Sequence, residues 1–136
     1  MGRRASREIV MKLLYQLELQ KEDRQEQIDL VLEQERLGDN DKKYVEDMIG
    51  GIYKNLSEID SLIEKGLKGW TLDRISKVEL AILRIALYEM KYREDIPIKV
   101  SFNEAIELTK RYSGQDKSAF INGLLGRYIT NDEYTE

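Results

Sequence analysis

Residues 78–90 read Val-Glu-Leu-Ala-Ile-Leu-Arg-Ile-Ala-Leu-Tyr-Glu-Met, and they are the most informative segment for the architecture. Ten of its thirteen residues are apolar, and the exceptions are Glu79, Arg84 and Glu89. At about 100° per residue these three side chains point in different directions around a helix, so no wide polar face remains. A helix that is apolar nearly all round is buried among other helices. We therefore predict that this segment is the central helix of a bundle.

The sequence on both sides of this segment also favours helices. The chain has 136 residues and one proline, Pro97, and prolines interrupt helices. Ile9, Leu13 and Leu17 recur at every fourth position, which is the apolar stripe of an amphipathic helix. The glycine pair at residues 50–51 lies within a helical pattern, so we expect another helix to approach it closely. We predict an all-α fold of about seven helices, in two small packed bundles around the central apolar helix.

A capping pattern occurs in the second half of the chain. Ser101 and Glu104 form a Ser-x-x-Glu box, in which each side chain satisfies a backbone N–H at a helix start. We predict a loop over residues 93–100 and a helix that begins at Ser101. All helices are expected to form a single domain, with an N-terminal lobe over about residues 1–56 and a C-terminal lobe over about 57–136.

Composition excludes several classes of site. The chain has no Cys and no His, which removes disulfides, thiol catalysis, His-based triads and His-based zinc sites. Phosphate-loop, dinucleotide-binding and nucleophile-elbow motifs are also missing from the sequence. No apolar run approaches the ~20 residues of a membrane span. We predict a cytoplasmic protein that is not an enzyme and that binds neither a metal nor a cofactor.

The first helix carries a candidate nucleic-acid surface, although the net charge of the chain is −4. On a helical wheel Arg3, Arg4 and Arg7 share a flank separate from the apolar stripe, and Tyr15 extends this flank. Arg4 and Tyr15 lie about three turns apart, roughly 16 Å, a length that spans several nucleotides of a single strand. Arginine pairs with phosphate and tyrosine stacks on bases. The alternative is that the arginines are only solvated and that Tyr15 lies at the rim of the core.

Residues 112–120, between two predicted helices, form a second candidate surface. Three nearby cations provide positive charge: Lys110, Arg111 and Lys117. The helix start near Asp116 or Ser118 offers backbone N–H groups to an anion. The alternative is a capped turn between helices, with Phe120 in the core.

Two further residues are ambiguous. Glu79 begins the central helix, where a carboxylate is favourable to the helix dipole. It either does only this or contacts a basic protein partner. Trp70 is expected in the core rather than in a binding site.

Several blocks of sequence carry a family resemblance. Residues 3–8 read Arg-Arg-Ala-Ser-Arg-Glu, and residues 14–16 read Leu-Tyr-Gln. Residues 70–75 read Trp-Thr-Leu-Asp-Arg-Ile and precede the central helix. Residues 103–108 read Asn-Glu-Ala-Ile-Glu-Leu, and residues 120–125 read Phe-Ile-Asn-Gly-Leu-Leu. In this order the blocks resemble the NusB family of transcription antitermination factors over nearly the whole chain.

The resemblance implies seven helices in two bundles and no catalysis. It also implies binding of boxA-type RNA in nascent ribosomal RNA transcripts, together with the ribosomal protein NusE. Such a complex makes elongating RNA polymerase ignore terminators. By position, the resemblance implies two RNA-facing sets: Arg3, Arg4, Arg7 and Tyr15 on the first helix, and Tyr112, Asp116, Lys117 and Phe120 in the second segment. It further implies that Glu79 faces NusE, with Asp73 as a weaker candidate.

Other functions remain open at this point. A NusB-like domain also precedes the catalytic part of some ribosomal RNA cytosine methyltransferases, so the chain could serve a separate catalytic partner. It could also be a protein-only adaptor in which the N-terminal arginines have no RNA role. A homodimer that covers the RNA face is a further alternative.

Overall fold

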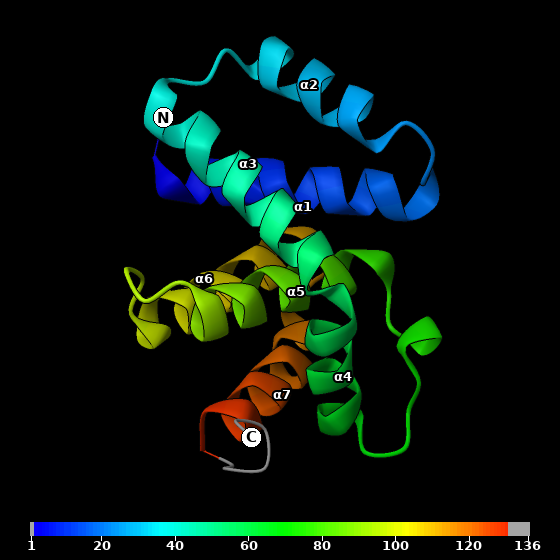
Figure 1. The fold of residues 1–136 in the computed structure, drawn as a ribbon. Helices are drawn as coiled ribbons and strands as arrows, with labels where there is room; N and C mark the ends of the chain where they lie inside the picture. Colours follow the sequence, from blue (N-terminus) through cyan, green and yellow to red (C-terminus); the bar gives the residue numbers. More distant parts are fainter. Residues whose placement is uncertain (1, 131–136) are drawn as a thin grey trace.

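The computed structural model describes residues 2–130, and within this range helices are joined by short connections (Figure 1). The elements in chain order are α1 (Arg3–Leu19), α2 (Arg24–Glu35), α3 (Asp39–Lys54), α4 (Leu56–Leu67), the short 3-10 helix η1 (Leu72–Arg74), α5 (Lys77–Tyr92), α6 (Ile98–Tyr112), the short 3-10 helix η2 (Gln115–Lys117) and α7 (Ser118–Thr130). The described part of the chain therefore has the predicted all-α fold with seven α-helices.

The apolar segment is the central helix, as predicted. It forms α5, which contacts α1 and α3 from the first half of the chain and α4, α6 and α7 from the second half. Ile82, Leu83 and Leu87 are completely buried. Burial of each such side chain stabilises the folded state by roughly 1.5–3 kcal/mol. In Figure 1, α1–α3 form the upper bundle and α4–α7 the lower one, and α5 joins the two. A lobe boundary near residue 56 remains a prediction.

The three polar residues of the apolar segment 78–90 are buried as well, and each has partners. Arg84 donates from Nε and Nη2 to Asp60 on α4, at 2.9 Å each, and from Nη1 to Glu18 on α1 at 2.7 Å. Glu79 and Glu89 accept hydrogen bonds from side chains of other segments. Buried charges require such pairing, so these residues fix how α5 sits against its neighbours.

The predicted start of the sixth helix is wrong. Helix α6 begins at Ile98, with Pro97 at its N-cap position, so the preceding loop is shorter than the predicted 93–100. The Ser101 hydroxyl donates to Glu89 at 2.7 Å, and Glu104 accepts from Arg4. Both residues of the predicted capping box therefore make contacts with other helices instead of capping their own.

Trp70 lies on the surface, so its predicted place in the core is also wrong. Lys68 and Gly69 have φ angles of 51° and 97°, and these left-handed residues turn the chain after α4. The turn carries Trp70 outward, where 59 % of it is exposed. The Arg74 guanidinium lies 5.6 Å from the centroid of its indole ring.

The glycine pair in α3 provides a matched test of helix packing. A Cβ at Gly51 would overlap the phenol ring of Tyr88 on α5, whereas a Cβ at Gly50 would meet nothing within 4 Å. We expect Gly51→Ala to lower the free energy of unfolding by about 1–3 kcal/mol, because Tyr88 must move. Gly50→Ala should raise it by up to about 1 kcal/mol. Urea denaturation of both variants measures this difference, and equal effects would contradict the close approach at Gly51.

None of the helices between residues 2 and 130 is both long enough and apolar enough to cross a membrane.

Candidate nucleic-acid interface

The first turn of α1 presents two exposed arginines. The Arg3 guanidinium lies 4.2 Å from the centroid of the Tyr44 ring. Arg4 donates to the Glu104 carboxylate from Nε at 3.0 Å and from Nη2 at 2.7 Å. Cations at a helix N-terminus oppose the helix dipole, and α1 has no acidic residue in its first turn. Helix stability therefore does not explain these arginines. Tyr15 lies three turns further along, and 39 % of it is exposed.

Arg7 does not share the exposed flank, and the helical-wheel prediction is wrong for this residue. It is 3 % exposed, and it donates to Glu89 from Nε at 2.9 Å and from Nη2 at 3.2 Å. Glu89 also accepts from the hydroxyls of Tyr44 and Ser101. Arg7 is thus the cation of a buried cluster that ties α1 to α3, α5 and α6. Its role in RNA binding stays a prediction, and it can act there by holding α1 in place.

Burial and charge act in opposite directions within this cluster. Burial disfavours the charged Arg7 guanidinium, but the hydrogen bonds and the charge of Glu89 outweigh burial and raise the pKa of Arg7. Burial, followed by the negative charge of Glu89, raises the pKa of Tyr44 well above its usual value. Arg7 is therefore charged, and Tyr44 is a neutral hydrogen-bond donor, over the physiological pH range.

The second predicted segment lies at the junction of α6 and α7. Tyr112 ends α6 and is half-buried, and Asp116 and Lys117 are exposed in η2. Phe120 is half-buried and packs against the core. The Ser118 hydroxyl donates to the Gln115 carbonyl at 2.7 Å, so it closes the turn. Lys117 is the exposed cation of this turn, and Phe120 serves mainly as packing.

Glu8 joins the two segments. Its carboxylate accepts from Arg111 Nη1 at 2.9 Å and from the hydroxyl of Tyr112. The Lys12 ammonium lies 5.6 Å from the centroid of the Tyr112 ring. Burial opposes ionisation of Glu8, but the hydrogen bonds from Tyr112 and Arg111 prevail and lower its pKa. The exposed end of α1 and the end of α6 therefore form one surface.

Sequence reasoning did not identify Glu8, Lys12 or Glu104 as part of this surface. Spacing along one helix cannot show a pair that forms between residues about a hundred positions apart. The sequence does carry a signal for the buried partner Arg7, because Glu89 lies in a helix that is apolar nearly all round and a buried carboxylate calls for a cation from elsewhere.

Comparison with known proteins identifies the family. A profile of the NusB family matches residues 4–130. The chain belongs to the NusB family. Transcription antitermination protein NusB of Acetivibrio thermocellus is 60 % identical over 129 residues, which is 95 % of this chain and 89 % of that protein. The protein of the same name from Clostridium botulinum (strain Loch Maree) is 46 % identical over 141 residues, covering 95 % of this chain and all of the relative.

Solved NusB structures have the same fold. NusB of T. maritima superposes with a TM-score of 0.89 at 37 % identity, over 99 % of this chain and 97 % of that one. A chain in a crystal structure of antitermination factors NusB and NusE in complex with dsRNA superposes with a TM-score of 0.83 at 26 % identity. That match covers 91 % of this chain and 92 % of the other.

The two residues expected to face NusE differ in accessibility. Glu79 is only 7 % exposed. Its backbone N–H donates to the Ser76 hydroxyl oxygen at 3.1 Å, and its carboxylate accepts from the Ser76 and Ser113 hydroxyls. Ser76 therefore caps the start of α5, and two hydroxyls hold the Glu79 carboxylate in the first turn, where the helix dipole favours a negative charge. Asp73 lies exposed in η1, so of the two it is the freer to meet a partner. Contact of either residue with NusE remains a prediction.

Proposed function

We propose that this NusB-family protein is a transcription antitermination factor that binds boxA-type RNA together with NusE. The observation that carries the proposal is the joining of two segments, the start of α1 and the α6–α7 junction, into one surface through Glu8. Arg3, Arg4 and Lys117 supply charge for phosphates on this surface, and Tyr15 supplies an exposed ring for stacking on a base. These groups bind and orient a strand, and the proposal is that the protein acts by binding.

The related complex of NusB and NusE with RNA supports the choice of partners. A protein with a net charge of −4 does not attract RNA over its surface as a whole, because both carry net negative charge. A basic partner that extends the RNA surface should therefore tighten binding. In the cell the complex would act on elongating RNA polymerase in the cytoplasm, so that the enzyme reads through terminators in ribosomal RNA transcripts.

The competing functions make different predictions. A methyltransferase-associated module would copurify with a catalytic partner. A protein-only adaptor would bind no RNA, and its partner would bind with little dependence on salt. A homodimer that covers the surface would show RNA affinity that falls as the protein concentration rises.

Fluorescence anisotropy with a labelled boxA-like RNA tests the proposal. The competitors are a scrambled single strand and the duplex of the same sequence, since the related complex contains double-stranded RNA. We expect selective binding of the boxA-like strand and a tightening by NusE of about 5–150-fold, the usual range for coupled sites. Equal affinity for the scrambled strand, or no effect of NusE, would contradict the proposal.

A further inference from the structure

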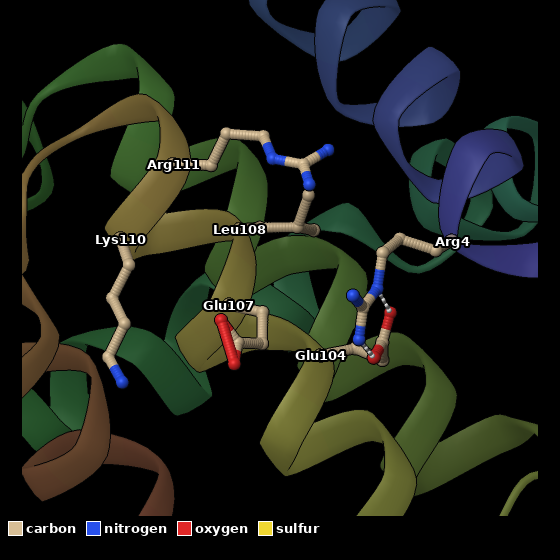
Figure 2. Close-up of a pocket in the computed structure, with 6 residues that line it drawn as sticks. All are labelled: Arg4, Glu104, Glu107, Leu108, Lys110 and Arg111. Carbon is tan, nitrogen blue, oxygen red and sulfur yellow. Dashed lines mark hydrogen bonds and ion pairs between the residues drawn. The ribbon is translucent and has the colours of Figure 1, made fainter.

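A pocket of about 270 Å³ lies between α1 and α6, beside the surface described above. Its lining residues are Arg4, Glu104, Glu107, Leu108, Lys110 and Arg111. In Figure 2, the guanidinium groups of Arg4 and Arg111 lie on either side of Leu108, and Lys110 points away from them. Because a water molecule takes about 30 Å³ in the liquid, the pocket has room for a phosphate group and its ester oxygens.

Both guanidinium groups keep donors for a further anion. Glu104 binds Nε and Nη2 of Arg4, which leaves Nη1. Arg111 donates from Nη1 to Glu8. This uses one of the five N–H donors of its guanidinium group, so others are left for an anion. The side chains of Arg4 and Arg111 remain 54 % and 53 % exposed. The carboxylates thus fix the orientation of the two groups, which lowers the conformational entropy lost when an anion binds.

We propose that this pocket holds a backbone phosphate of the RNA, bound between Arg4 and Arg111. The inference rests on the proposed function, and it adds a contact on α6 between the two RNA-facing segments. The exposed Glu107 at the rim repels anions, so a free phosphate is held poorly. An RNA strand that is also bound at α1 and at η2 keeps its phosphate close to the pocket. These linked contacts raise the effective concentration of the phosphate there.

The test compares three variants by anisotropy with the boxA-like RNA across salt concentrations. Arg111→Gln removes one charge from the pocket, and Lys99→Gln removes one charge from the other end of α6, about 18 Å away along the helix. Arg111→Lys keeps the charge. We expect Arg111→Gln to weaken binding about five- to tenfold. It should also reduce the salt slope, the steepness with which the logarithm of the binding constant falls with the logarithm of the salt concentration, by about 0.7, the value for one phosphate contact on a single strand. Lys99→Gln should stay within twofold of wild type, and Arg111→Lys should keep the slope.

The slope separates a phosphate contact from a structural role, because loosening of the α1–α6 contact lowers affinity without changing the number of ions released. An Arg111→Gln variant that matches Lys99→Gln, or that loses affinity at an unchanged slope, would overturn the proposal. Inorganic phosphate should displace RNA no better than chloride at equal ionic strength, and specific displacement would reassign the pocket to a free anion. If wild type itself shows no selective binding, the proposed function fails. If wild type binds selectively and Arg111→Gln binds as wild type does, the pocket assignment alone fails.

Discussion

Arg7→Met should lower the free energy of unfolding by about 3–5 kcal/mol, the usual effect of removing one partner of a buried ion pair. The carboxylate of Glu89 is fully buried, and Arg7 is the only cation that the described part of the chain places against it. Without Arg7 this charge keeps, among residues 2–130, the hydroxyls of Tyr44 and Ser101 as its hydrogen-bond donors. The cluster connects four helices, so we expect its loss to lower the melting temperature by roughly 10 °C or more.

Arg4→Met on the same helix is the matched control. Arg4 also pairs bidentately with a glutamate, but its side chain is half exposed, and such surface pairs contribute about 0–1 kcal/mol. Urea denaturation followed by circular dichroism measures both variants. If Arg7→Met costs no more than Arg4→Met, the buried pair does not anchor α1.

A second large effect is expected on RNA binding. The triple variant Arg3→Ala, Arg4→Ala, Tyr15→Ala removes from α1 the two proposed phosphate contacts and the proposed stacking surface. Stacking alone contributes about 1–3 kcal/mol per base, so we expect boxA affinity to fall on the order of a hundredfold. The salt slope should fall by about 1.4, which is 0.7 for each lost phosphate contact. All three side chains are exposed, so the helix content should be unchanged.

The connection between α4 and α5 offers a control of the same chemistry. Lys68, Trp70 and Arg74 are two cations and one aromatic ring, and all three are exposed. Their triple replacement by alanine changes the net charge equally, and without NusE it should leave RNA affinity within about twofold. Equal losses in the two triple variants would mean that overall charge, and not the α1 surface, governs RNA binding.

The contrast between Arg3 and Arg7 shows how far sequence alone predicts the site. The two residues are four positions apart and therefore differ by only about 40° around α1. A helical wheel places both on one flank, yet Arg3 is exposed and Arg7 is buried. The difference comes from Glu89 on α5, 82 positions away. Ser101 and Glu104 illustrate the same limit, because their contacts with α5 and α1 replace the local capping that their spacing predicts.

The order of residues along the chain is enough to predict the local features: seven helices, the all-round apolar α5, the buried stripe of α1 and the cations at its start. These follow from helical period and composition, which are properties of neighbouring residues. Packing between helices, in contrast, settles which charges are buried, which are paired and that Glu8 connects the two segments predicted to face RNA. The reason is physical: the free energy of a charge depends on how deeply other helices cover it and which opposite charge they bring, and both are fixed by packing between distant parts of the chain.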